Sequence, residues 1–364
     1  MKLLYITNGV SGSGGLERVL AIKTDYLIDV LGYEVHIMVL NTNETSFFYS
    51  FNKKIVFHGL NLSGNLIKFH FSYFKQVNHL IKKINPNIVT VCDDGLKGFV
   101  VPCVTKFKAI VYERHASIHL NTIASESKWK KVFLRSLMIF LAKKFQKFVV
   151  LTESNKLDWD AKNLIVIPNF YSFYPNKSAK LQNKKVIVVG SHSYNKGYDL
   201  LLHSWKKISK EFPDWSLEIY GKIDKDKTYL KLSKELKLEE SVTFFNPVNN
   251  IEEKYLEASI FVLPSRSEGF GMVLLEAMAC GLPCVSFDCP SGPADIIRDG
   301  EDGFLIPLLE LQNFEDKIKL LMDDFSLRKK MGSKAKENVM RFSVENIMKK
   351  WDALYKNLVH EDSI

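Results

Sequence analysis

Short aliphatic runs alternate with amphipathic segments along the whole chain, and this alternation constrains the fold more than any single motif. Runs of this kind bounded by polar residues predict β-strands, and the segments between them have helical periodicity. Strands that are separated by helices form parallel sheets with both faces covered. The predicted strands are residues 2–7, 34–40, 55–60, 88–92, 109–113, 148–151 and 164–167, then 185–189, 217–220, 242–245, 260–263, 284–287 and 304–306.

We therefore expect an α/β protein of two Rossmann-like domains whose parallel sheets face a central cleft. A chain of 364 residues fits two domains of about 150–200 residues each. The periodic pattern stops at residues 168–183, where Pro, Asn, Ser, Lys and Tyr replace it. The predicted N-terminal domain spans 1–172 and the C-terminal domain 173–342, and a last helix in 343–364 packs back on the N-terminal domain. Ligands of such sheets bind at the carboxyl ends of the strands.

Cysteine usage and apolar run length exclude other classes of protein. Five cysteines with no Cys-x-x-Cys pair argue against disulfides and a zinc site, and they favour the reducing cytoplasm. The longest apolar run, residues 132–142, contains Arg135 and falls well short of the ~20 residues that a membrane span needs.

The net charge of +9 belongs to the first half of the chain. Residues 1–172 contain 22 Lys and Arg against 12 Asp and Glu, which is +10, and the remainder contains 28 against 29, which is −1. Residues 128–147 carry seven Lys or Arg and no acid among apolar residues such as Trp129 and Phe133, and residues 66–84 have the same character. Basic amphipathic helices lie on anionic membranes, and solvated lysines on ordinary helices are the alternative. We expect peripheral association with the inner face of the cytoplasmic membrane, and we expect no nucleic-acid partner because no reader motif is present.

The most informative stretch, residues 264–277, places glycines and acidic residues where a strand leads into a helix. Gly269 and Gly271, on either side of Phe270, let the backbone approach a ligand, and the helix N-terminus offers N–H groups to a phosphate. Glu276 lies among apolar residues of the helix, where an idle charge would be costly. It can accept two hydrogen bonds from a ribose diol, and Glu268 in the loop can bind a sugar. The alternative reading makes Glu268 an ordinary helix-start acid and Glu276 part of a solvated face.

This stretch, with Cys-Gly-Leu-Pro at 280–283 and Ser-Gly-Pro-Ala-Asp at 291–295, resembles the donor site of the family-four retaining glycosyltransferases of GT-B fold. The resemblance is greatest to bacterial enzymes that build exopolysaccharide, capsule and lipid-linked glycans. It implies that Glu276 binds the ribose of a nucleoside diphosphate and that Glu268 contacts the donor sugar. It also implies a UDP-linked hexose or N-acetylhexosamine as donor, a lipid-linked or growing glycan as acceptor, and no metal or other cofactor.

A second loop, residues 188–199, places Lys196 at a helix start after Gly190. A cation is needed where a departing diphosphate accumulates negative charge in water-poor surroundings. Members of the family usually have an arginine directly after the glycine, and Ser191 stands there instead. We expect Lys196 to bind the diphosphate, either with backbone amides alone or with His192 or Arg266. A surface ion pair is the alternative for Arg266.

A glycine-rich loop at residues 8–18 follows the first strand and precedes the first helix. It superficially resembles a dinucleotide fingerprint, but Glu17 stands at the third glycine position, and Asn41 and Thr42 follow the second strand instead of a ribose-binding acid. In the family that the chain resembles, Gly14 and Gly15 approach the donor phosphates and the acceptor side of the cleft.

His115 follows the strand predicted at residues 109–113, so it is expected at the mouth of the cleft. It could hydrogen-bond the reacting sugar or the acceptor, and many members of the family that the chain resembles carry a histidine at the end of this strand. A structural histidine is the alternative, and Glu113 with Arg114 could form a local ion pair. Asp224 and Asp226 have Asp-x-Asp spacing in a lysine-rich turn and predict no metal site, and Asp93 with Asp94 lacks further ligands.

The resemblance implies front-face displacement, in which the acceptor hydroxyl attacks on the face that the diphosphate leaves and the leaving phosphate takes the proton. No carboxylate pair with hydrolase-like spacing stands out, which agrees with this mechanism. Two alternatives are a GT-B sugar-nucleotide epimerase, which would release free sugar without an acceptor, and a non-catalytic sugar-nucleotide-binding protein.

Overall fold

The computed structural model describes residues 1–12, 14–40, 47–60, 62, 65–93, 95–115 and 128–361. The chain divides into two compact units, Met1–Asn169 with Val344–Ile364 and Phe170–Ser343. The sequence places these boundaries after residues 172 and 342. Asn41, Thr42 and Asp94, which were considered above, and Ser13 of the glycine-rich loop lie outside the described residues.

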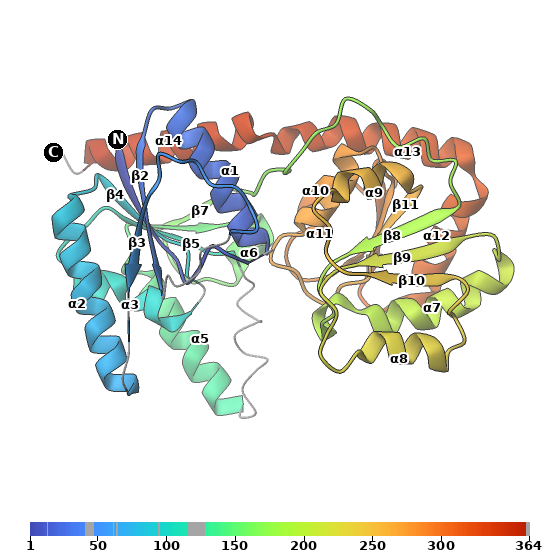
Figure 1. Ribbon diagram of the computed structural model, residues 1–364, viewed down its shortest axis with the longest axis horizontal. Helices are drawn as coiled ribbons and strands as arrows, with labels where there is room; N and C mark the ends of the chain where they lie inside the picture. The colour runs from blue at the N-terminus through green and yellow to red at the C-terminus, as the bar shows by residue number, and fades with distance from the viewer. Residues whose placement is uncertain are drawn as a thin grey trace. The chain divides into compact units, whose positions relative to one another are not determined.

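The first unit contains a seven-stranded parallel sheet of order β3-β2-β1-β4-β5-β6-β7 (Figure 1). Its hydrophobic core includes Tyr112 and Phe148, whose rings are stacked with their centroids 4.9 Å apart. Its elements in chain order are β1 (Lys2–Ile6), α1 (Gly15–Asp29), β2 (Glu34–Leu40), β3 (Val56–Leu60), α2 (Leu66–Ile84), β4 (Ile88–Val91), α3 (Leu96–Val104), β5 (Ile110–Glu113), α5 (Lys128–Ala142), β6 (Lys147–Val150), α6 (Glu153–Leu157), β7 (Leu164–Val166) and α14 (Val344–Glu361).

The second unit contains a six-stranded parallel sheet of order β10-β9-β8-β11-β12-β13 (Figure 1). Its core includes Trp205, which has no exposed surface. Its elements in chain order are β8 (Lys185–Val189), η1 (Tyr194–Lys196), α7 (Tyr198–Glu211), β9 (Ser216–Tyr220), α8 (Thr228–Glu235), β10 (Val242–Phe245), α9 (Ile251–Glu257), β11 (Ile260–Leu263), α10 (Met272–Ala279), β12 (Cys284–Asp288), α11 (Pro293–Ile296), β13 (Gly303–Pro307), α12 (Leu311–Asp323), α13 (Phe325–Asn338) and η2 (Val339–Phe342).

The predicted fold class, two Rossmann-like units with parallel sheets, is confirmed. Every predicted strand is present with its ends within one residue of the expected ones. The strands could be predicted from the sequence because central strands of parallel sheets are buried on both faces. In β4, for example, all four residues are buried. Within the basic segment 128–147, helix α5 ends at Ala142, and a turn at Lys143 and Lys144 leads into β6.

The last helix, α14, belongs to the first unit. Its Tyr355 hydroxyl lies 2.9 Å from that of Tyr5 on β1 and 3.3 Å from Oγ1 of Thr90 on β4. Its Trp351 ring covers the ammonium group of Lys23 on α1 at 3.0 Å from the ring centroid. The end of the chain is thus anchored through polar contacts inside the core of the unit that contains its beginning.

Each sheet has one point where the strand order reverses, between β1 and β4 in the first unit and between β8 and β11 in the second. Open α/β sheets bind ligands at such points, outside the carboxyl ends of the strands. The residues that follow β8 are Gly190 to Lys196, and those that follow β11 are Pro264 to Gly271. The topology therefore brings the two motif loops of the second half to one edge of one sheet.

Candidate functional site

Close backbone approaches hold these loops together at the edge of the second sheet. Gly197 has a φ of +64°, and a Cβ there would lie 1.9 Å from the carbonyl oxygen of Pro264. Gly292 has a φ of +111°, and a Cβ there would lie 1.8 Å from the carbonyl oxygen of Phe270. Only glycine fits at either position, so the loops after β8, β11 and β12 pack closely against one another.

Lys196 and Glu268 meet in this cluster. Nζ of Lys196 donates to Oε1 of Glu268 at 2.7 Å, and the hydroxyl of Ser265 donates to the same oxygen at 2.6 Å. The lysine stem passes over Gly190, where a Cβ would lie 3.1 Å from it. Both charged side chains are mostly buried, so the pair is held in a defined place at the strand ends.

Glu276 lies inside α10 and is 1% exposed. Its carboxylate accepts from the hydroxyl of Ser172 at 3.0 Å and from that of Tyr255 at 3.3 Å. Neither donor was expected from the sequence, because both lie far from Glu276 along the chain. These two hydroxyls donate to different oxygens of the carboxylate and so fix both of its oxygen atoms.

Gly271 caps the N-terminus of α10 with a φ of +96°, between the loop that contains Gly269 and the helix that contains Glu276. Phe270 is buried, and its ring packs edge-on against Phe342 at 5.9 Å. Phe270 therefore anchors the loop to the unit, while Gly271 adopts the left-handed backbone conformation at the start of the helix.

Arg266 forms an ion pair with Asp199. An ion pair was the alternative considered above to a role for this arginine in binding the diphosphate. Its two terminal nitrogens lie 2.8 and 2.6 Å from the two oxygens of Asp199, and the guanidinium covers the ring of Tyr194 at 4.2 Å. Although burial raises the pKa of Asp199, the hydrogen bonds and charge of Arg266 hold it below its ordinary value. Arg266 also donates to the carbonyl oxygen of Tyr194, so it stabilises the turn that contains Lys196.

His192 lies inside the second unit among three aromatic rings, those of Tyr198, Tyr229 and Phe244. Its Nδ1 is 3.8 Å from Asp224, and burial lowers the pKa of the imidazole although Asp224 acts in the opposite direction. Ser191, which stands at the usual arginine position, is exposed. The two neighbouring residues therefore face different environments, and His192 supports the loop from within the core.

In the first unit, His115 follows β5 and its Nε2 lies 3.2 Å from Oε1 of Glu113. The other oxygen of Glu113 accepts from the ammonium group of Lys23 at 2.7 Å. Both Lys23 and Glu113 are fully buried, and this position of Lys23 could not be predicted because the residue lies on a helix far from the strand end along the chain.

Gly14 and Gly15 begin α1 and are exposed, with Gly14 as the N-cap. The carboxylate of Glu17 lies over this loop, 2.5 Å from where a Cβ of Gly14 would be and 2.4 Å from where one of Gly12 would be. The carboxylate thus occupies the space beside the helix N-terminus that an anionic ligand would enter.

Three potential metal ligands, Cys92, Glu113 and His115, lie close together in the first unit. A cation already occupies this place, because Nζ of Lys23 is 2.7 Å from Glu113. In the described part of the second unit, Asp224 instead accepts hydrogen bonds from the backbone and hydroxyl of Thr228 at the start of α8. These contacts fit the turn that the sequence indicated for Asp224.

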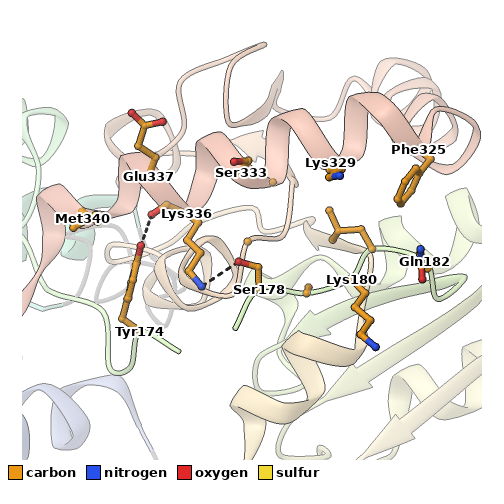
Figure 2. A pocket seen from close by; sticks show the side chains of 14 residues that line it. Tyr174, Ser178, Lys180, Gln182, Phe325, Lys329, Ser333, Lys336, Glu337 and Met340 are labelled. Atoms are coloured by element: carbon orange, nitrogen blue, oxygen red, sulfur yellow. Dashed lines mark hydrogen bonds between the residues drawn. The ribbon is translucent and has the colours of Figure 1, made fainter. Parts of the chain in front are cut away.

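A cavity of 840 Å³ lies between the segment 174–182 and α13 (Figure 2). Lys336 lines it and donates to the carbonyl oxygens of Pro175 and Lys177 and to the hydroxyl of Ser178. Its ammonium protons are thus used to hold the segment against the helix. None of the predicted site residues lines this cavity.

The family profile described as "Glycosyl transferases group 1" matches residues 172–338, which include both loops of the second unit. An uncharacterised glycosyltransferase of Haemophilus influenzae is 31% identical over 365 residues, covering 97% of this chain and 99% of the relative. The chain belongs to the group 1 glycosyltransferases. The AmsD glycosyltransferase of amylovoran biosynthesis in Erwinia amylovora is 29% identical over 367 residues, covering 96% of this chain and 98% of that one.

Among solved structures, this glycosyltransferase is similar to an S. aureus TarM mutant in complex with Fondaparinux, alpha-GlcNAc-glycerol and UDP. The TM-score is 0.80 at 17% identity, covering 97% of this chain and 99% of that one. Identity this low shows a shared fold, which is GT-B. Within the part of this glycosyltransferase that the structure describes, no helix combines the length and apolar character of a membrane span.

Proposed function

We propose that this glycosyltransferase transfers a hexose or N-acetylhexosamine, with retention, from a UDP-sugar to a lipid-linked or growing glycan of a cell-surface polysaccharide. The observation that carries the proposal is the bonded Lys196 and Glu268 pair at the strand ends of the second sheet, followed along the chain by buried Glu276 inside α10. The name of AmsD, an amylovoran biosynthesis glycosyltransferase, supports a polysaccharide as the product. The TarM complex, which contains UDP, supports UDP as the nucleotide of the donor.

Lys196 is the proposed diphosphate ligand. An ammonium group has three protons, so Lys196 can keep its bond to Glu268 and still donate to a phosphate oxygen. Negative charge on the leaving diphosphate grows toward the transition state, so a fixed cation there lowers the barrier more than it tightens ground-state binding. We expect that no bound metal ion is needed for this role.

Glu268 and Glu276 are the proposed ligands of the other two parts of the donor, its sugar and its ribose. Glu268 accepts hydrogen bonds on one oxygen from both Lys196 and Ser265, which fixes its carboxylate for contact with sugar hydroxyls. Glu276 accepts from Ser172 on one oxygen and from Tyr255 on the other, which fixes its carboxylate, and it is the proposed partner of the ribose diol. In this proposal the acceptor hydroxyl attacks from the face that the diphosphate leaves, and the leaving phosphate oxygen takes its proton. His115 contacts the acceptor or the reacting sugar.

An anionic membrane surface is the proposed location of the acceptor. Helix α5 exposes Trp129 at 85% and Phe133 at 67%, and α2 exposes Ile67 at 81% and Phe71 at 73%. Both helices contact α3, and Figure 1 shows the three next to one another in the first unit.

The other face of α5 packs inward through Met138 and Leu141, so its apolar residues occupy two faces. Exposed aromatic residues among lysines are typical of helices that lie in a membrane interface. This supports peripheral binding to the inner face of the cytoplasmic membrane more than a merely solvated lysine face.

The proposed function is tested by incubating the purified full-length protein with UDP-glucose, UDP-galactose and their N-acetyl analogues, with lipid extracts as acceptor. UDP release that depends on the extract, and a product whose anomeric configuration by NMR equals that of the donor, are the expected results. Release of free sugar without any acceptor would indicate an epimerase-type reaction. Binding of UDP with no turnover in any mixture would indicate a non-catalytic binding protein.

A further inference from the structure

An irregular stretch of the second unit, residues 171–179, forms a strap along α10, the helix that contains Glu276. Near one end of the strap, the hydroxyl of Ser172 donates to Oε1 of Glu276 at 3.0 Å. At the other end, the backbone N–H of Ala179 donates to the carbonyl oxygen of Cys280 at 2.8 Å. Glu276 and Cys280 are one turn apart, so the strap follows the end of α10 past the proposed ribose ligand.

The strap also contacts the second hydroxyl donor of Glu276. The ring of Phe173 packs against that of Tyr255, with their centroids 6.2 Å apart. The Tyr255 hydroxyl in turn donates to Oε2 of Glu276 at 3.3 Å. One donor to the carboxylate therefore belongs to the strap, and the other packs on it. A carboxylate held on both oxygens has less freedom left to lose when a ligand binds.

Lys336 of α13 holds the middle of the strap (Figure 2). Its ammonium group donates to the carbonyl oxygens of Pro175 and Lys177, both at 2.7 Å, and to the hydroxyl of Ser178 at 3.1 Å. An ammonium group has three protons, and these bonds use all of them. The same ammonium group lies over the ring of Tyr174, 5.1 Å from its centroid. One side chain thus fixes the strap from Tyr174 to Ser178.

Helix α13 packs too closely on the end of α10 for the two to shift freely. A Cβ on Gly332 of α13 would lie 2.3 Å from the carbonyl oxygen of Gly281, which follows α10. Gly281 has a φ of +79°, and a Cβ there would lie 3.3 Å from Cβ of Ser178 in the strap. Helix α13 is therefore a fixed base from which Lys336 holds the strap against α10.

We propose that Lys336 is a positioning residue of the nucleotide site. By fixing the strap, it sets the place of the Ser172 hydroxyl and the packing of Phe173 on Tyr255, and these hold the carboxylate of Glu276 ready for the ribose diol. This inference rests on the role proposed above for Glu276. It gives α13, which contains none of the predicted site residues, a part in donor recognition.

Calorimetric titration of the full-length protein with UDP and with dideoxy-UDP, which lacks both ribose hydroxyls, tests the proposal. The wild type is expected to bind UDP about tenfold more tightly than dideoxy-UDP. Lys336→Met and Ser172→Ala are each expected to weaken UDP binding about fivefold and to leave dideoxy-UDP binding within about twofold of wild type. Lys329→Met is the matched control, because Lys329 is an exposed lysine of α13 that lines the same cavity. It is expected to bind both nucleotides like the wild type.

The comparison of the two nucleotides separates positioning from support of the fold. Equal weakening of UDP and dideoxy-UDP in Lys336→Met would mean that Lys336 only stabilises the unit, and unchanged binding of UDP would mean that the strap holds without it. Either result overturns the inference. If Lys336→Met does not fold, Lys336→Gln, which keeps a shorter hydrogen-bond donor, takes its place with the same expected loss for UDP alone.

Glu276→Ala in the same experiment distinguishes failure of this inference from failure of the proposed function. If Glu276→Ala loses the preference for UDP and Lys336→Met keeps it, only the role of Lys336 is wrong. If Glu276→Ala prefers UDP as strongly as the wild type does, Glu276 does not bind the ribose, and the inference fails together with that part of the proposed function.

Discussion

Nζ of Lys196 lies 2.7 Å from Oε1 of Glu268, so the residues proposed to meet the donor's diphosphate and its sugar are bonded to each other. The pair joins the loop after β8 to the loop after β11 at the reversal point of the second sheet. A donor bound there would contact both ends of one ion pair. Changing either residue therefore removes the ion-pair contact of its partner as well.

Lys196→Met is expected to lower kcat by about 10²–10³, by analogy with the loss of one oxyanion donor, and to change the KM for the donor much less. The reason is that the charge on the leaving diphosphate is greatest in the transition state. Steady-state kinetics of UDP release measures both constants. Lys184→Met is the matched control, because Lys184 is exposed and pairs with exposed Asp214. A kcat within twofold of wild type would mean that a group other than Lys196 binds the diphosphate.

Arg266→Lys is expected to lower the thermal unfolding temperature, with a loss of about 1 kcal/mol, because lysine cannot replace the two-point bond to Asp199 or the stacking on Tyr194. Since Arg266 braces the Lys196 turn from outside, kcat is expected to stay within about threefold of wild type. Calorimetry and donor kinetics on the same preparation measure the two effects. A large loss of kcat without loss of stability would instead assign Arg266 to the donor.

Replacing Trp129 and Phe133 by serine is expected to reduce recovery with anionic vesicles in flotation assays. Wild type is expected to float with phosphatidylglycerol vesicles at low salt and much less at high salt, because each basic residue near the surface contributes about 1 kcal/mol. Leu309→Ser, which changes an exposed apolar residue of the second unit, is the control. Equal recovery of wild type with neutral and anionic vesicles would mean that the lysines only solvate the helices.

Lowering the pH is expected to reduce the free energy of unfolding of the first unit, because the carboxylate of Glu113 becomes protonated. Its pKa in the folded protein is about 2, below the ordinary value of 4.5, so its contribution is complete above pH 4.5 and is lost as the pH falls toward 2. The full shift corresponds to about 3 kcal/mol. Urea unfolding at pH 7, 5 and 3 is expected to show a smaller acid loss in the variant with both Lys23→Met and Glu113→Gln. Parallel pH curves for the two proteins would contradict this assignment.

The strands and the motif loops could be predicted because their signals are local. β11 is a continuous apolar run, β4 is apolar except for Thr90, and Glu268, Gly271 and Glu276 lie within one short stretch. The partners of these groups could not be predicted. Tyr255 contacts Glu276 across 21 positions, and Lys23 contacts Glu113 across 90, so only the packing of helices on the sheets brings them together. His192 shows the same limit, because its place among aromatic rings from α7, α8 and β10 is set by the tertiary fold.

The most direct test of the account is calorimetric titration of UDP into the wild type and into Glu276→Ala. The wild type is expected to bind one UDP, and the variant to bind at least about tenfold more weakly, because hydrogen bonds from the ribose to a charged acceptor are lost. Glu240→Ala, which changes an exposed acid of the same unit, is expected to bind like the wild type. Equal UDP affinity in Glu276→Ala and the wild type would contradict the placement of the nucleotide at the strand ends of the second sheet.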